Sequence, residues 1–298
     1  MRLGIDLGGT KIAAAVLAGD GRTRWETRVA TPRGDYDGTI AAIAELVAAG
    51  ERAAGESCTI GIGIPGAVSP ATGLIKNANS VWLNGRAFHV DLERHLGRPI
   101  QLANDANCLA VSESTDGAAA GARVVFGVIL GTGVGGGIAI DGRTLTGPNA
   151  IAGEWGHNSL PWPRADELPG TPCYCGRQGC IETFLSGPGL AADFARHTGS
   201  AATGESVVAL AAGGDTPAQL VMDMWIDRLA RGLASVINVL DPDVIVVGGG
   251  LSRIARLYED VPRAWGAWVF SDRVATRLVP ARHGDASGVR GAAMLISR

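Results

Sequence analysis

The sequence predicts a mixed α/β protein built from two related halves. Three observations support this fold class. Apolar segments of strand length, glycine-rich breaks and stretches of helical spacing alternate along the whole chain. Glycine supplies 44 of the 298 residues, against about 7% in average proteins, which indicates many tight turns or close approaches of the backbone to a ligand. One pattern of strands and turns also occurs twice, first from residue 2 and again from residue 124.

The first copy of this pattern opens the chain. Arg2–Asp6 and Ile12–Leu17 are apolar and are separated by a break at Gly8-Gly9. The Asp20-Gly21 pair favours a tight turn, which leads into a third antiparallel strand over Arg22–Ala30.

The second copy has the same order of parts. Val124–Leu130 is apolar, Gly131–Gly137 is a glycine-rich break that contains a threonine, and Ile138–Ile140 precedes a turn at Asp141-Gly142. No shorter period is present, so the pattern favours a duplicated fold over a solenoid. Glycine-rich hairpins are common, and coincidence is the alternative.

The remaining elements fit a layered α/β arrangement. They include two helices with apolar faces and three buried-type strands. The helix faces are Ile40, Ile43, Leu46 and Val47, and Leu229, Leu233, Val236, Ile237 and Leu240; the strands are Thr59–Ile64, Pro99–Ala103 and Val244–Val247. Small residues cluster at Gly117–Gly121, which predicts one domain over 1–118 and a second over 119–286. A cleft between the two halves is the expected ligand site.

Composition excludes several classes of protein. With 26 basic and 29 acidic residues the net charge is −3, which gives no sign of a nucleic-acid or acidic-membrane partner. No apolar stretch reaches the roughly 20 bulky residues of a membrane span, and the first ten residues lack the pattern of a signal peptide. Five cysteines, three of them within eight residues, suit metal binding in a reducing compartment. We therefore expect a cytoplasmic protein.

The first glycine-rich turn has the groups of a phosphate site. Gly8 and Gly9 allow backbone N–H groups to approach phosphate oxygens, and Thr10 and Lys11 add donors and positive charge. Asp6, just before the turn, is suited to hold Mg²⁺. The string does not match the GxxxxGK[ST] phosphate loop. A hairpin that only needs positive φ is the alternative.

The second turn contains a Gly-x-Gly-x-x-Gly spacing, which is weak evidence here. A dinucleotide site requires a helix to follow, whereas Ile138–Ile140 reads as a strand. Two phosphate-type hairpins favour a nucleoside triphosphate instead. The residues expected to contact it are Gly131, Thr132, Gly133, Gly135 and Gly136.

Asn104 and Asp105 lie where a strand ends and a helix begins. A carboxylate at Asp105 is placed to accept a proton from an attacking hydroxyl, as phosphoryl transfer requires. The alternative is a helix N-cap, which the local sequence alone favours.

The most specific constellation is a metal site. Three thiolates and one imidazole complete a tetrahedral Zn²⁺ site, and four protein ligands leave no position for water, so the zinc is expected to be structural and a zinc hydrolase is disfavoured. The ligands are His157, Cys173, Cys175 and Cys180. Unligated thiols are the alternative reading, as for Cys58 and Cys108, which are expected to be small buried residues.

Polar residues on both sides of this region suggest a sugar site. Glu154 and Glu182 flank the expected zinc ligands, and carboxylates suit the paired hydroxyls of a sugar. Asn77, Asn79 and Trp82 suggest a polar rim with an aromatic wall. The alternatives are ordinary surface charge and a capped loop with one core tryptophan.

Together these motifs resemble the ROK family of bacterial repressors, open reading frames and kinases, and most closely its fructokinase (mannofructokinase) branch. They occur in the family's order and cover nearly the whole chain. They are Asp6-Leu-Gly-Gly-Thr-Lys11, Gly61-Ile-Gly-Ile-Pro-Gly66, Lys76-Asn-Ala-Asn-Ser-Val-Trp-Leu-Asn-Gly85, Asn104-Asp-Ala-Asn107, the Gly131–Gly137 turn, Glu154-Trp-Gly-His157 and Cys173-x-Cys-Gly-x-x-Gly-Cys-x-Glu182.

The resemblance implies an actin-like ATPase fold, with two ribonuclease H-like domains and ATP in a central cleft. It implies that Asp105 is the general base, that Asp6 helps to position Mg²⁺, and that His157 binds zinc through one ring nitrogen and sugar through the other. It further implies that the last helix, 287–297, returns to the first domain, that Gly248, Gly249 and Gly250 border the adenosine, and that homodimers are usual. The implied sugar contacts are Gly66, Asn79, Asn104, Asp105, Glu154, His157 and Glu182.

The expected activity is ATP-dependent phosphorylation of D-fructose at its 6-hydroxyl, with mannose or glucose as secondary substrates. A kinase for N-acetylglucosamine or glucose is the first alternative. A sugar-responsive transcription repressor is the second. It is disfavoured because such family members carry an added DNA-binding segment of roughly 80 residues, in line with a helix-turn-helix module, whereas here the first strand starts at Leu3.

Overall fold

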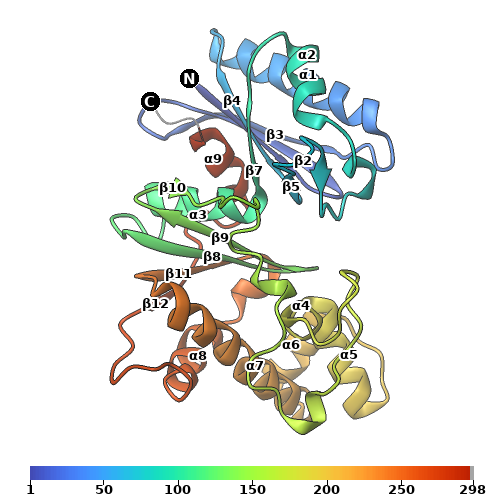
Figure 1. Ribbon diagram of the computed structural model, residues 1–298, viewed down its shortest axis with the longest axis vertical. Helices are drawn as coiled ribbons and strands as arrows, with labels where there is room; N and C mark the ends of the chain where they lie inside the picture. The colour runs from blue at the N-terminus through green and yellow to red at the C-terminus, as the bar shows by residue number, and fades with distance from the viewer. Residues whose placement is uncertain (296–298) are drawn as a thin grey trace. The chain divides into compact units, whose positions relative to one another are not determined.

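The computed structural model describes residues 1–295 and confirms a mixed α/β fold (Figure 1). Contacts divide it into two compact units. Unit 1 contains residues 1–123, 137–152 and those from 282 onward, and unit 2 contains residues 124–136 and 153–281. These units differ from the expected domains chiefly in the grouping of 137–152; the domain division itself stays a prediction.

The sheet of unit 1 has five strands in the order β3-β2-β1-β4-β7. The strand β1 pairs antiparallel with β2 and parallel with β4, and β4 pairs parallel with β7. The bounds are β1 Arg2–Leu7, β2 Lys11–Leu17, β3 Thr23–Ala30, β4 Thr59–Ile64 and β7 Gln101–Asn104.

Helices cover both faces of this sheet (Figure 1). Along β2, Ile12, Ala14 and Val16 enter the core that includes residues of α1 and α2, whereas Ala13 and Ala15 pack with Val289 of α9. This alternation is the period-two pattern of a strand buried on both faces. The helices are α1 Tyr36–Ala54, α2 Phe88–Leu96, α3 Asp105–Thr115, which packs on α9, and α9 Ser287–Met294.

Glycine in β4 allows α9 to dock on the sheet. A Cβ on Gly61 would overlap the carbonyl of Ala292 in α9, so a larger residue would force the helix away. The helix expected over 287–297 begins at Ser287 and packs within unit 1. Residues 296–298 lie outside the described part of the chain.

The second sheet repeats the topology of the first, with the order β10-β9-β8-β11-β12. As in the first sheet, the two later strands are parallel: β11 pairs with β8, and β12 pairs with β11. The matching order supports the duplication expected from the sequence. The bounds are β8 Val124–Leu130, β9 Val134–Ile140, β10 Arg143–Thr144, β11 Val244–Gly248 and β12 Arg277–Pro280.

The second glycine-rich break is shorter than expected. Only residues 131–133 form the turn, and Val134–Gly137 belongs to β9. A Cβ on Gly136 would come within 2.5 Å of the Gly153 carbonyl oxygen and 2.6 Å of Trp155 Cδ1, and the Trp155 indole nitrogen donates to the carbonyl of Gly135 at 3.0 Å. In β9, glycine allows neighbouring groups to approach the strand closely and does not mark a turn.

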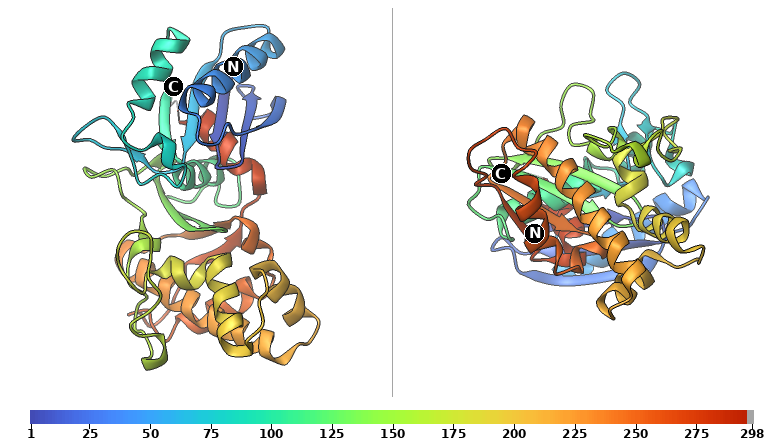
Figure 2. Two further views of the ribbon diagram at one scale, coloured as in Figure 1. Left: turned by 90° about the vertical axis from the view of Figure 1, so that its right-hand side faces the viewer. Right: turned by 90° about the horizontal axis from the view of Figure 1, so that it is seen from below.

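The helices of unit 2 gather around the long helix α7, as the yellow and orange ribbons in Figure 2 show. No helix within residues 1–295 is long and apolar enough to cross a membrane. The bounds are α4 Ile181–Leu185, α5 Gly187–Thr198, α6 Gly204–Ala212, α7 Thr216–Leu240 and α8 Leu257–Trp265. The short elements are β5 Ala67–Val68, β6 Ile75–Lys76, η1 Val81–Leu83, η2 Trp155–His157, η3 Ala165–Glu167, η4 Gly250–Arg253 and η5 Gly284–Ala286.

Candidate functional site

The first glycine-rich turn joins β1 to β2 as expected. Gly8 N donates to Lys11 O at 3.0 Å, and the Thr31 hydroxyl donates to Gly8 O at 2.8 Å, so the turn is held from both sides. Lys11 is exposed at the start of β2. The turn thus places Gly8, Gly9, Thr10 and Lys11 at one end of the sheet.

Asp6 precedes this turn on β1 and is held in a poorly solvated position. Burial raises its pKa from 3.8 to about 6, and the positive charges of Lys11 and Arg28 offset only part of that effect. Its carboxylate lies against Gly288 of α9, where an added Cβ would come within 2.6 Å of Oδ2. Asp6 is half-buried, and carboxylates with a raised pKa are common at functional sites.

Asn104 and Asp105 occupy the junction of β7 and α3. Asn104 is the N-cap of α3: its Oδ1 accepts from Ala106 N at 2.9 Å, and its amide nitrogen donates to Gly66 O at 3.2 Å. Asp105 Oδ1 also accepts from Ala106 N, at 2.8 Å. The cap reading therefore holds for Asn104, while Asp105 is the first helical residue, and the structure brings both together with Gly66.

Gly66 requires glycine because its φ is +78° and an added Cβ would overlap the backbone of Lys76 and Ala78. The same segment carries the expected sugar ligand Asn79. Asn84, a residue that the sequence analysis missed, pins this segment because its side chain exchanges hydrogen bonds with the N–H and C=O of Ala78 at 2.9 and 2.8 Å.

Trp82 follows the alternative reading rather than the expected one. Its indole nitrogen donates to the Thr39 hydroxyl of α1 at 3.2 Å, and its ring packs against the core of unit 1. Trp82 is partly buried, and this packing favours the alternative of a core tryptophan. The neighbouring residues of the loop did not predict the packing of Trp82, because that packing depends on α1.

In unit 2 the second glycine-rich turn is held by two backbone hydrogen bonds and by one to a side chain. Gly131 N donates to Gly133 O at 3.0 Å, and Gly187 N, at the start of α5, donates to Gly131 O at 2.8 Å. Glu182 Oε2 accepts from Val134 N at 2.8 Å. One oxygen of this expected sugar ligand is therefore engaged with the turn itself.

A pocket of about 580 Å³ opens beside this turn, entirely within unit 2. Two helices, α5 and α6, begin at it, and helix N-termini suit anionic ligands. At α5 the N–H groups of Gly187 and Gly189 already donate to Gly131 O and to Ser186 Oγ. Its lining residues are Gly131, Thr132, Gly187, Pro188, Ala191, Ala202, Thr203, Gly204, Glu205, Gly250 and Leu251.

The sequence analysis anticipated only part of this lining. Of the residues expected to contact a nucleotide in this unit, Gly131, Thr132 and Gly250 line the pocket, whereas Gly133, Gly135, Gly136, Gly248 and Gly249 are not among its lining residues. The two helix starts were missed. Their signals are the capping residues Ser186 and Thr203, whose side chains accept from backbone N–H groups of the first turn.

The four expected zinc ligands converge in unit 2. Their ligand atoms all lie within 4.8 Å of one another. His157 Nδ1 is 3.6 Å from Cys173 Sγ, and Cys175 Sγ is 3.5 Å from Cys180 Sγ. Ligands of a tetrahedral zinc, with bonds of roughly 2.0 to 2.3 Å, lie at about such separations. The donor set and its spacing therefore fit Zn²⁺.

Tyr174, a residue that the sequence analysis did not single out, contacts the other face of this histidine. His157 Nε2 lies 3.0 Å from the Tyr174 hydroxyl, and the two rings meet edge to face with centroids 5.1 Å apart. Partial desolvation, and then the charges of Glu182, Cys173 and Glu154, raise the pKa of Tyr174 to about 12.

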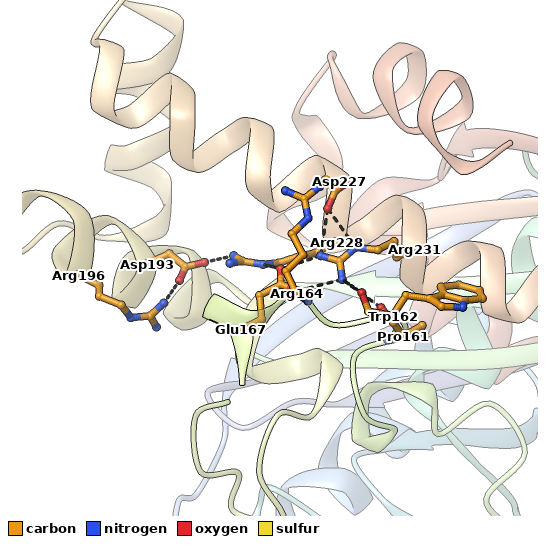
Figure 3. Close-up of polar contacts among 9 residues, drawn as sticks. All are labelled: Pro161, Trp162, Arg164, Glu167, Asp193, Arg196, Asp227, Arg228 and Arg231. Carbon is orange, nitrogen blue, oxygen red and sulfur yellow. Dashed lines mark hydrogen bonds and ion pairs between the residues drawn. The ribbon is translucent and has the colours of Figure 1, made fainter. Parts of the chain in front are cut away.

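A buried network of charges anchors the segment that follows His157 to α7 (Figure 3). Glu167 accepts from Arg228 Nε at 2.7 Å and from both terminal nitrogens of Arg231, at 2.6 and 2.9 Å, and Arg228 also pairs with Asp193. Arg231 donates in turn to the carbonyls of Pro161 and Trp162. The sequence signal was two arginines, three residues apart, on the face of α7 that also carries buried apolar residues.

Comparisons with known proteins agree with these features. The model of the ROK family matches residues 2–298. Two N-acetyl-D-glucosamine kinases are similar over 99% of both chains: that of Escherichia coli O6:H1 is 39% identical and that of Salmonella heidelberg is 38% identical.

Solved structures are similar over nearly their whole length. The ROK hexokinase of Thermus thermophilus is 33% identical with a TM-score of 0.87, over 99% of this chain and 97% of that one. A ROK glucokinase of Streptomyces griseus, in complex with glucose and AMPPNP, is 30% identical with a TM-score of 0.81, over 99% and 98%. The duplicated actin-like fold, the spacing of the motifs and these matches lead to one conclusion: the chain belongs to the ROK family and is a sugar kinase.

Proposed function

We propose that this protein transfers the γ-phosphoryl group of ATP to the 6-hydroxyl of N-acetyl-D-glucosamine. The observation that carries the choice of sugar is the similarity, over 99% of both chains, to N-acetyl-D-glucosamine kinases of two genera. Fructose, the first expectation from the sequence, gives way to the alternative because neither of these relatives is a fructokinase.

The pocket of unit 2 is our proposed nucleotide site. Its glycine turn and the start of α6 are proposed to offer backbone N–H groups to phosphates. Lys11 and the turn Gly8–Thr10 of unit 1 are proposed to contact the transferred phosphoryl group. Asp6 is proposed to hold Mg²⁺, directly or through water, and that ion neutralises phosphate charge.

Asp105 is our proposed general base. Its Oδ1 is engaged by Ala106 N, and this bond orients the carboxylate that accepts the proton of the sugar hydroxyl. Asn104, Gly66 and Asn79 of unit 1 are proposed to bind sugar hydroxyls.

Glu154, His157 and Glu182 of unit 2 are proposed to complete the sugar contacts, next to a structural Zn²⁺ held by His157 and the three cysteines. When bound, the zinc would crosslink His157 to the loop of the three cysteines. A closed set of four ligands argues against a zinc hydrolase. A homodimer and a cytoplasmic location remain predictions, the latter supported by five cysteines without disulfides.

A substrate panel tests the proposal. With ATP and Mg²⁺, N-acetylglucosamine should show a higher kcat/KM than glucose, mannose or fructose in an assay of ADP release. A higher kcat/KM for fructose would restore the first expectation, and activity on none of the four would refute the proposal.

The assignment of the base has its own test. Asp105→Asn should lower kcat by roughly 10²- to 10⁴-fold and leave zinc content and far-UV circular dichroism unchanged. Asp20→Asn, in the exposed hairpin turn of unit 1, is the matched control and should keep wild-type turnover. Near wild-type kcat in Asp105→Asn would contradict the role of this carboxylate.

A further inference from the structure

The strand β3 forms an open edge of the sheet of unit 1. In the order β3-β2-β1-β4-β7 it is the end strand, and within residues 1–295 no strand other than β2 pairs with it. It is eight residues long and mostly exposed, and Val29 is 37% exposed. A long exposed edge is a template for another strand, and proteins either cover such an edge or protect it with charges.

The backbone of β3 presents Glu26 and Arg28 to the open side. Thr31 N donates to Thr10 O at 3.1 Å, and these two residues continue the register in which Lys11 pairs with Ala30. The direction of the N–H and C=O groups alternates along a strand. The odd-numbered residues of this stretch therefore bond to β2, and the N–H and C=O groups of the even-numbered residues point outward.

The side chains of β3 differ between its two faces. Trp25, Thr27 and Val29 line a groove of about 640 Å³ between β3 and α1. On the other face, Glu26 and Arg28 are exposed and have opposite charges. The edge thus combines free backbone groups with an apolar row and a charged row.

These rows are complementary to a second copy of β3 in one antiparallel register. When a twofold axis passes through Thr27, Glu26 of each copy lies opposite Arg28 of the other, and Trp25 lies opposite Val29 at the groove. Directly opposite pairs of unlike charge stabilise a sheet, and pairs of like charge destabilise it. An axis at Glu26 or Arg28 would place like charges opposite each other, and an axis at Trp25 would place Arg28 opposite Arg22.

We propose that β3 pairs antiparallel with β3 of a second copy of this chain, with Thr27 at the twofold axis, so that two unit 1 sheets join into one continuous sheet. The charge pattern favours a second copy over a different protein, because it matches itself in this register and repels itself in the neighbouring ones. Trp25 and Val29 of both copies then cover the open side of the groove. The inference concerns a surface outside the proposed active site and does not depend on the proposed function.

Charge reversal tests the pairing. Glu26→Arg and Arg28→Glu, each alone, turn both charged pairs of the proposed dimer into pairs of like charge. The dimer dissociation constant, measured by sedimentation equilibrium at low salt, should rise at least about 4-fold in either variant. An equimolar mixture of the two variants should regain wild-type association, because every pair in the mixed dimer again joins opposite charges. Glu259→Arg, on the exposed side of α8, is the matched control and should not change association.

A disulfide tests the register. Thr27 and its symmetry mate form a non-hydrogen-bonded pair with Cα atoms about 4.5 Å apart, a separation that a disulfide can span. Mild oxidation of zinc-saturated Thr27→Cys should therefore yield a covalent dimer. Val29→Cys, on the same face, is the matched control, because its symmetry mate lies roughly 13 Å away along the strands. The wild type, which has five cysteines of its own, gives the background.

Each other outcome overturns the inference. A monomeric wild type shows that the charges of β3 protect the edge instead of pairing it. A wild-type dimer that neither charge reversal weakens uses another surface. Weakening in both variants without recovery in the mixture shows damage to the strand and not a loss of charge pairing. Thr27→Cys that crosslinks no more than Val29→Cys excludes the register. None of these measurements uses phosphoryl transfer, so a failure of the proposed function would not alter them.

Discussion

Glu167→Gln offers a direct test of the buried charge network. Gln has nearly the same shape as Glu but removes the negative charge that Arg228 and Arg231 share. Burial alone would raise the pKa of Glu167, but hydrogen bonds from Arg231, from Arg164 N and from Arg228 outweigh it and lower the pKa from 4.5 to about 2. The network therefore stabilises the ionised carboxylate in the folded state.

The size of the effect follows from this shift. About 2.5 pKa units correspond to about 3 kcal/mol of unfolding free energy at neutral pH. Removing one partner of a buried ion pair costs about 3–5 kcal/mol. The lower figure applies because Arg228 keeps Asp193, and Arg231 keeps Asp227 and two carbonyls. For a unit of this size the melting temperature should fall by roughly 6–12 °C.

The pH dependence has a defined sign. Because the folded pKa is depressed, the stabilisation is fully present above pH 4.5 and is lost as pH falls toward about 2. The difference between wild type and variant should therefore be constant at neutral pH and shrink below pH 4.5. Thermal and urea unfolding, followed by the fluorescence of the tryptophans of unit 2 in zinc-saturated protein, measures it.

Glu259→Gln is the matched control. Glu259 forms an exposed pair with Arg263 on α8 at 3.6 Å, and such surface pairs contribute about 0–1 kcal/mol. If Glu167→Gln destabilises no more than this control, or equally at pH 7 and pH 3, the network does not stabilise the segment as argued.

Three further predictions concern other parts of the molecule. Asp6→Asn should abolish turnover yet stabilise the fold by up to about 3 kcal/mol above pH 6, because the raised pKa means that the folded protein disfavours the ionised carboxylate. This gain in stability should vanish below pH 4, where the carboxyl group is protonated. Urea unfolding at several pH values measures it. Gly66→Ala should lower stability by about 1–3 kcal/mol and weaken sugar binding, because of its positive φ and the backbone of Ala78; equal melting curves would contradict this. Removal of zinc by a chelator should increase hydrogen exchange over 154–182 and raise KM for the sugar more than KM for ATP; equal increases in both would show a wider role for the metal.

Local sequence was sufficient wherever the chemistry is set by neighbours along the chain. The hairpin turns, the N-cap at Asn104 and the four zinc ligands could all be predicted, because turn formation, capping and ligand spacing depend on few consecutive residues. The duplicated sheet was visible for the same reason, since each copy repeats one order of strands and glycines.

Long-range packing decided what the sequence left open. Trp82 is partly buried because α1 offers its indole nitrogen a partner, and position 136 has no room for a side chain because Gly153 and Trp155 come close. The starts of α5 and α6 meet at one pocket, and Tyr174 meets His157, only after the chain has folded. A sequence shows which groups are present, but their burial and their partners arise from segments far apart in the chain.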